Sequence, residues 1–161
     1  MNNFTAACNV IKDQLGGNVV IALSTCANNV PGVRSVNGYY KDGYIYIVTH
    51  RNSHKMQDIS VNNEIAFSRN YDDSLPFYTG LLSGSGEAEN IGHPTDSGNK
   101  ELREELKQVF SDFYDLHVNE ADKGTCILKI RLTKAIVFDG EYKYTAEYDN
   151  ETADKMVCKI S

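Results

Sequence analysis

The sequence contains no tryptophan, only three prolines and no Cys-x-x-Cys pair. None of its apolar runs approaches the length that spans a bilayer, so a membrane partner is not expected. Its four cysteines stand far apart without a neighbouring histidine, a pattern that fits neither a zinc site nor a dense disulfide framework. Residues 1–17 lack the basic segment and apolar core of a signal peptide. We therefore expect a cytoplasmic protein with reduced thiols and no resident metal.

The bulk composition is that of one soluble domain. The chain has 161 residues, of which 41% are hydrophobic and 24% are charged. A net charge of −6 argues against a nucleic-acid partner, although it allows a local basic site for one small anion. We expect a single domain over residues 1–161, with its core at about 18–138. The acidic tail, 139–161, has weak periodicity and is assigned no firm structure.

The predicted elements are short strands with helices inserted between them. Alternating or branched apolar residues favour strands, and apolar residues at helical spacing favour helices. The strands are expected at 18–26, 33–41, 44–49, 64–69, 79–89 and 125–138, and the helices at 2–15, from 54, and 97–117. Turns are expected at 27–32 and at Asp42-Gly43, and residues 71–78 are expected to form a surface connection. The pattern predicts a mainly β (α+β) fold: a six-stranded antiparallel barrel flanked by helices.

Residues 44–69 contain the clearest candidate for a binding site. A strand ends at Thr49, Ser53 is a candidate N-cap for the next helix, and Lys55 lies in that helix's first turn. A hydroxyl, the N–H groups of a helix start and a cation together suit a phosphate. The alternative is an ordinary capped helix with a solvated lysine.

The glycine-rich segment 79–89 has two interpretations. It is either a strand whose glycines permit a bulge or the close approach of something flat, or a loosely structured loop.

Histidines and tyrosines near the hairpins suggest weaker sites. We expect His50 to be a solvated loop residue, and a metal pair with His54 is disfavoured because His50 precedes the helix. The clustered tyrosines on residues 39–46 are expected to pack at a dimer interface rather than to stack on a flavin.

The run from Val30 to Ser68 resembles the flavin-binding split-barrel family typified by pyridoxamine 5′-phosphate oxidase. The resemblance covers residues 19–70 well and extends to the late strand 129–140. The family pattern is an arginine on a strand, a Gly-containing hairpin, a strand ending in threonine, and Ser-x-Lys at a helix start. Here these are Arg34, Asp42-Gly43, Thr49 and Ser53-His54-Lys55, followed by Asn62-Asn63 and the strand from Glu64.

This resemblance implies a split β-barrel homodimer that binds FMN in a groove between the subunits. By position, the phosphate would be held by Arg34, Ser53 and Lys55, with Thr49 beside them. A guanidinium fork with an ammonium and helix N–H groups suits a phosphate dianion. The isoalloxazine and ribityl chain would be lined by the backbone around Ser35, Val36, Val48 and His54.

The sequence departs from a true pyridoxamine-phosphate oxidase at its end, because neither arginine nor histidine follows Arg131. The substrate-phosphate motif is therefore missing. The resemblance implies an FMN-dependent oxidoreductase or flavin reductase acting on an unidentified small substrate, in which the flavin performs the redox step. The alternatives are a non-catalytic flavin- or haem-binding protein for storage, sensing or detoxification, and a cofactor-free dimeric interaction module. No catalytic acid or base is assigned.

Overall fold

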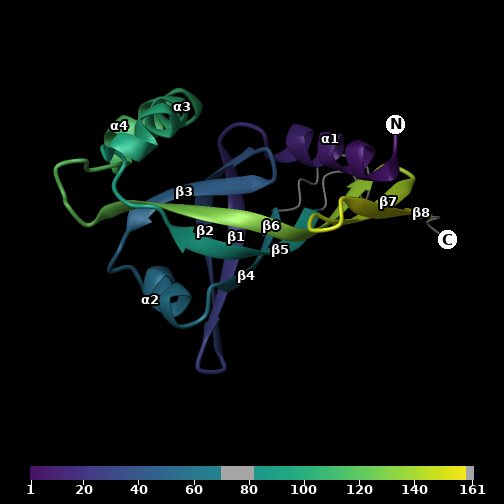
Figure 1. Ribbon diagram of the computed structural model, residues 1–161, viewed down its shortest axis with the longest axis horizontal. Coiled ribbons are helices and arrows are strands. Elements are labelled where there is room, and N and C mark those ends of the chain that lie inside the picture. Colours follow the sequence, from purple (N-terminus) through teal and green to yellow (C-terminus); the bar gives the residue numbers. More distant parts are fainter. Residues whose placement is uncertain (70–81, 159–161) are drawn as a thin grey trace.

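The structure is a computed structural model that describes residues 1–69 and 82–158, and it is built on one eight-stranded antiparallel sheet (Figure 1). The strands are β1 (Val19–Ala27), β2 (Val30–Lys41), β3 (Tyr44–His50), β4 (Glu64–Arg69), β5 (Leu82–Asn90), β6 (Thr125–Asp139), β7 (Tyr142–Glu147) and β8 (Thr152–Val157). Their order is β3-β2-β1-β4-β5-β6-β7-β8, and β3 also pairs with β6. That pairing closes six strands into a barrel, as predicted.

The barrel closes because apolar residues alternate along its strands. Ile21 and Leu23 of β1 are fully buried, and their neighbours on the strand point outward. β6 is buried on both faces over its first half, since Leu128 faces the barrel core and Ile127 faces a helical layer outside it. Two-sided burial explains the short apolar run Cys126–Leu128 at the start of β6, before Lys129 and Arg131 begin to alternate with apolar residues.

Helices cover the barrel at three places (Figure 1). They are α1 (Asn3–Leu15), α2 (His54–Val61), the 3₁₀ turn η1 (Ser97–Asn99), α3 (Lys100–Phe110) and α4 (Asp112–His117). α1 packs beside β7 and β8, α2 connects β3 to β4, and α3 with α4 covers the outer face of β3 and β6. In the described residues, no helix is long and apolar enough to cross a membrane.

The prediction of one helix over 97–117 is wrong in its continuity. Ser111 has φ 46°, a left-handed conformation that no α-helix contains, and it separates α3 from α4. The change of direction lets Tyr114 pack with Phe110 and Ile127 in one cluster. Burial of these rings favours the break over a straight helix.

The turn predicted at 27–32 is shorter than expected. Only Asn28 and Asn29 turn, both with positive φ, and Ala27 already pairs with Val30. Pro31 therefore lies inside β2. Val30 and Ala27 form the hydrogen-bonded pair that flanks the two-residue turn, so the backbone nitrogen of the next residue, Pro31, points away from β1. On that side no described strand pairs with β2 at this position, so the N–H that proline lacks is not needed.

The tail, to which the sequence pattern assigned no structure, is folded. Residues 142–157 form the β7–β8 hairpin, which extends the sheet from the second half of β6 beyond the barrel. Tyr144 and Ala146 are buried there, close to α1. The edge strand β8 is exposed along most of its length, which explains the weak periodicity of the tail.

The glycine-rich segment is a strand with a bulge, in agreement with the first interpretation. The register between β5 and β6 shifts between Ser85 and Gly86, and Thr133 is the extra residue on β6. The ring of Phe67 lies where a side chain on Gly84 would stand, so it is the flat group that the glycine admits. The connection predicted at 71–78 and the start of this segment at 79–81 lie outside the described residues.

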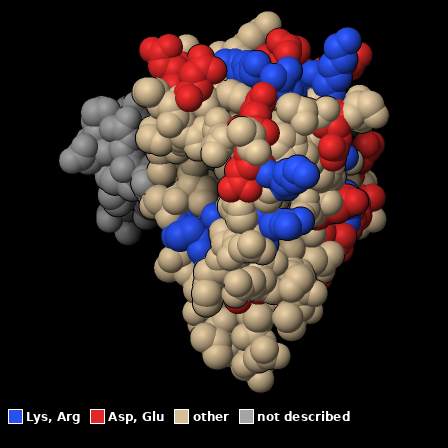
Figure 2. All heavy atoms as spheres, turned by 90° about the vertical axis from the view of Figure 1, so that its left-hand side faces the viewer, with Lys and Arg blue, Asp and Glu red and all other residues tan. Residues whose placement is uncertain are grey.

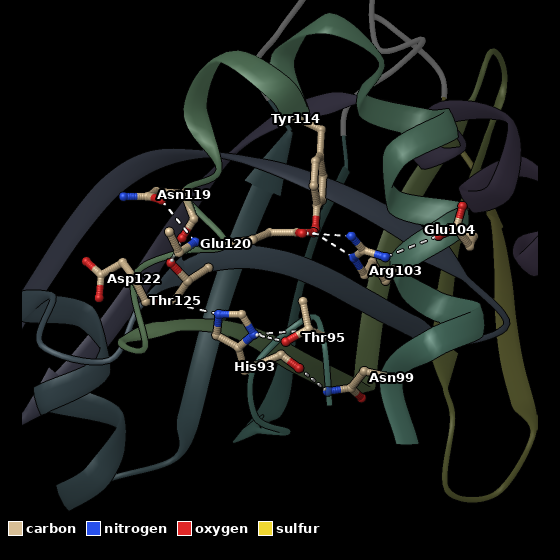
Figure 3. Close-up of polar contacts among 11 residues, drawn as sticks. His93, Thr95, Asn99, Arg103, Glu104, Tyr114, Asn119, Glu120, Asp122 and Thr125 are labelled. Atoms are coloured by element: carbon tan, nitrogen blue, oxygen red, sulfur yellow. Dashed lines mark hydrogen bonds and ion pairs between the residues drawn. The ribbon is translucent and has the colours of Figure 1, made fainter. Parts of the chain in front are cut away.

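A charged cluster fastens the α3–α4 layer to the loop before β6 (Figure 3). Arg103 of α3 donates to Glu120 through Nε at 2.6 Å and Nη2 at 2.7 Å, and the hydroxyl of Tyr114 donates to the same carboxylate at 2.8 Å. These bonds, with the Arg103 bonds foremost, lower the pKa of Glu120 to about 2. The cluster therefore stabilises the fold only while Glu120 is ionised.

We expect Glu120→Gln to lower the free energy of unfolding at pH 7 by about 1 kcal/mol, since the pair is partly exposed. The carboxylate contributes fully above its unfolded pKa near 4.5, and the contribution is lost as pH falls toward 2. Urea unfolding at pH 7 and pH 3 checks this, because the variant should lose less stability on acidification. Glu104→Gln is the matched control, since Glu104 is 59% exposed and 3.4 Å from Arg103. Equal effects of the two variants would contradict the prediction.

Candidate functional site

Arg34 of β2 is bound to Thr25, near the C-terminal end of β1. Nη1 of Arg34 donates to Oγ1 of Thr25 at 2.7 Å, and Nη2 lies 3.6 Å from the carboxylate of Asp58 on α2. The Thr25 hydroxyl in turn donates to Asp58 at 2.6 Å. The side chain of Arg34 is 23% exposed, so it reaches the surface while Nη1 is bonded to Thr25.

Lys55 is the second cation, and it lies near Arg34. Its half-burial lowers the pKa of the ammonium below the usual value, and the positive charge of Arg34 lowers it further. Within residues 1–69 and 82–158, Lys55 has neither a hydrogen bond nor an ion pair. A half-buried cation that faces a second cation, without a counter-ion, is a place where an anion is favoured.

Thr49 and Ser53 lie at the junction between β3 and α2. Their hydroxyl oxygens are 3.4 Å apart. Ser53 occupies the predicted N-cap position of α2, but its hydroxyl makes no capping bond. The backbone N–H groups of His54 and Lys55 thus have no acceptor in the described part of the chain. We call Arg34, Thr49, Ser53 and Lys55 the cradle. Thr49 and Ser53 lie at the junction before α2, and Lys55 lies in the first turn of that helix. Arg34 lies near Lys55 and near Asp58 of the same helix.

The half-buried charge of Lys55 lowers the free energy of unfolding of the protein without a ligand. Because the folded pKa is lowered, the protein should gain stability as pH rises through the interval between the folded and unfolded pKa values. We expect Lys55→Met to raise the free energy of unfolding at pH 7 by about 0.5 kcal/mol, the half-exposed position limiting the gain. Denaturant unfolding at pH 7 and pH 10 checks this. A destabilised variant, or an unchanged alkaline rise, would contradict it.

The remaining predicted cofactor residues each lie within two positions of a cradle residue along the chain. The side chain of Ser35 is exposed beside Arg34, whereas Val36 packs against the barrel core. Val48 packs against the α3–α4 cluster. The imidazole of His54 is 85% exposed, with Nδ1 3.9 Å from Asp58.

His50 points away from the cradle. Its Nε2 lies 3.2 Å from Oδ2 of Asp122, and its Nδ1 accepts the N–H of Asn52. The ring covers Gly124, where a side chain would overlap it. His50 is therefore a residue that fastens the 119–124 loop, not a freely solvated one. His50 and His54 lie next to different carboxylates, Asp122 and Asp58, and the described residues contain no cluster of three or more metal-ligating side chains.

Sequence reasoning missed Thr25 and Asp58, which hold Arg34. Two signals could have found them. Thr25 continues the inward series of Ile21 and Leu23, where a polar residue needs a buried partner. Asp58 follows Lys55 by three residues on α2, so the two side chains share a helix face.

A large hollow lies elsewhere in the described residues. It has a volume of about 730 Å³ and opens between α1, the β2–β3 turn and the β7–β8 turn. Its aromatic side is formed by Phe4, Tyr40 and Tyr148, and the two tyrosine hydroxyls are 3.3 Å apart. Its charged lining is mixed, with Lys12 and Lys41 against Asp42 and Glu151. None of the cradle residues lines it.

Comparison with known proteins identifies the fold. No family model and no curated protein matches the chain. A haem storage protein from Vibrio cholerae superposes with a TM-score of 0.64 at 9% identity, over 85% of this chain and 95% of that one. An FAD-binding protein from Mesorhizobium loti gives 0.62 at 16% identity, over 80% and 91%. A protein from Listeria innocua described as a candidate pyridoxamine 5′-phosphate oxidase gives 0.59 at 14% identity, over 84% and 97%.

Proposed function

We propose that this chain, which has the split-barrel fold of the pyridoxamine 5′-phosphate oxidase-like proteins, binds FMN and uses it as a redox cofactor. The observation that carries the proposal is the proximity of Arg34 to a half-buried Lys55 that has no hydrogen bond or ion pair among residues 1–69 and 82–158. Similar folds are described as binding FAD and storing haem, so a planar cofactor suits this architecture.

The cradle fits the phosphate group of FMN. Arg34 and Lys55 supply two positive charges, and Asp58 offsets part of the first. The N–H groups of His54 and Lys55 and the hydroxyls of Thr49 and Ser53 can donate further bonds to phosphate oxygens. These residues bind and orient the phosphate, while the flavin supplies the electron and hydride chemistry for a small substrate.

We also propose that the flavin groove is completed in a homodimer. The tip of the β1–β2 hairpin carries no charged residue from Thr25 to Val33, and Val30 and Val33 are 68% and 70% exposed. Figure 2 shows charged side chains concentrated over the upper part of the molecule and few over its lower part, where this hairpin lies in Figure 1. An uncharged surface with two exposed valines, next to Arg34, suits a second copy of the chain. Sedimentation equilibrium measures the oligomeric state directly.

A haem-binding protein is the second candidate. It is supported by the fold shared with a haem storage protein and by the exposed imidazole of His54 beside the cradle. A Soret band in the purified protein would favour this function over the flavin.

The deciding experiment compares FMN with riboflavin, which lacks the phosphate. After an absorption spectrum of the freshly purified protein, the flavin-free protein is titrated with each compound and binding is followed by flavin fluorescence. We expect FMN to bind at least about 100-fold more tightly, because charge-assisted bonds to the phosphate are lost with riboflavin. Bleaching of the bound FMN by NADH or NADPH, and reoxidation by an acceptor, would identify a reductase. Equal affinities would refute the phosphate site.

A further inference from the structure

The guanidinium of Arg34 is bonded on one side only. Nη1 donates to Thr25 at 2.7 Å and also lies 3.3 Å from the carbonyl oxygen of Leu23 and 3.5 Å from that of Gly32. Among the residues that the structure describes, Nη2 has only the 3.6 Å approach to Asp58. Nε has no partner within the described residues. The edge formed by Nε and Nη2 is thus the side of the guanidinium whose N–H groups can still donate to a ligand.

Thr25 determines which side that is. Its side chain is 1% exposed, and its one hydroxyl accepts from Arg34 while it donates to Asp58. A hydroxyl has a single proton, so its donation to the carboxylate leaves its lone pairs directed at the guanidinium. Asp58 therefore orients the Thr25 hydroxyl, and the hydroxyl orients Arg34.

Gly32 leaves the space that this arrangement needs. A side chain at position 32 would come within 2.9 Å of Nη2 of Arg34 and 3.9 Å of Asp58. The guanidinium thus lies between Thr25 and the backbone of Gly32, which limits its rotation. A fixed fork is the geometry that binds two oxygens of one phosphate at once.

We infer that Thr25, oriented by Asp58, is the positioning residue that presents the Nε–Nη2 edge of Arg34 to a phosphate monoester. The inference rests on the proposed function, since it names how the cradle selects its ligand. A guanidinium edge of this kind also pairs with a carboxylate, as Arg103 does with Glu120. The preference for a phosphate monoester comes from its second negative charge and its further oxygens, which Lys55 and the N–H groups at the start of α2 can meet.

Thr25→Val tests the role of the hydroxyl without changing charge or volume much. We expect FMN to bind about tenfold more weakly, since the hydrogen bond that Thr25 accepts from a charged group is lost. The affinity for riboflavin should not change, because riboflavin has no phosphate. Thr25→Ser, which keeps the hydroxyl, should restore FMN binding to within about twofold of the unmodified protein. In an Arg34→Ala background, Thr25→Val should have no further effect.

A second measurement needs no flavin. The Nε–H resonance of Arg34 in a ¹H–¹⁵N spectrum reports its order, and inorganic phosphate is the probe. We expect an ordered Nε–H that shifts with added phosphate, a mobile one in Thr25→Val, and an ordered one in Thr25→Ser. A Thr25→Val variant that keeps Nε–H order or full FMN affinity would overturn the inference. Failure of the proposed function gives a different result, because FMN and riboflavin would then bind the unmodified protein with equal affinity. The inference about Thr25 would still be tested in that case by the response of the Arg34 Nε–H resonance to inorganic phosphate.

Discussion

Replacing both Arg34 and Lys55 with alanine should weaken FMN binding by about 10³-fold or more. Truncating one partner of a buried charge pair costs roughly 2–5 kcal/mol, and here the phosphate loses both of its cations. The double variant should remain folded, because Lys55 has no partner in the described residues and its burial opposes its charge. Isothermal titration calorimetry at fixed ionic strength measures the effect, and increasing salt should weaken FMN binding less in the variant.

The matched control removes two cations elsewhere. Lys100 and Lys155 are exposed, on α3 and β8, so Lys100→Ala with Lys155→Ala changes the net charge equally. We expect this variant to bind FMN with nearly the affinity of the unmodified protein. A cradle variant that binds FMN no more weakly than this control would show that the phosphate lies elsewhere.

Gly84→Ala should lower the free energy of unfolding by about 3 kcal/mol, since overpacked positions typically cost 1–3 kcal/mol and this one has no room to relax. A methyl group on Gly84 would overlap the carbonyl oxygen of Lys134 and the ring of Phe67. The carbonyl belongs to β6 next to the bulge, and the ring is buried at 3% exposure. Neither can move without shifting a barrel strand. Denaturant unfolding, followed by circular dichroism, measures the loss.

Gly98 provides the control for this substitution. It lies in η1, and a methyl group there would have no atom within 4 Å. We expect Gly98→Ala to change the stability by less than about 0.5 kcal/mol, or to increase it slightly by restricting the unfolded chain. If the two variants had equal stability, Gly84 would not be required by close packing.

Several elements could be predicted because their causes are local in the chain. The Asp42-Gly43 turn has the positive φ angles that favour these two residues, and it joins β2 and β3 as expected. α1 begins after Asn2, whose side chain accepts from Thr5, and its apolar stripe is buried. The proximity of Thr49, Ser53 and Lys55 could be predicted in the same way, because they are close along the sequence. The resemblance added Arg34, and the binding of a phosphate by these residues stays a prediction.

Other features depend on contacts between distant segments. The β7–β8 hairpin is stable because Tyr144 and Ala146 are buried in the core near α1, a contact that weak periodicity did not indicate. The break at Ser111 likewise results from packing of Tyr114 on β6. Local pattern cannot predict either, since the energy comes from a surface formed more than ten residues away.

The sequence by itself determined the alternation of strands, the barrel that they predict and the position of the cations along the chain. Only the tertiary structure decided that Arg34 is held by Thr25 and Asp58 and that Lys55 has no partner in the described residues. The physical reason is that alternation and turn chemistry act between neighbours, whereas the charge balance of a site depends on which segments the barrel brings together.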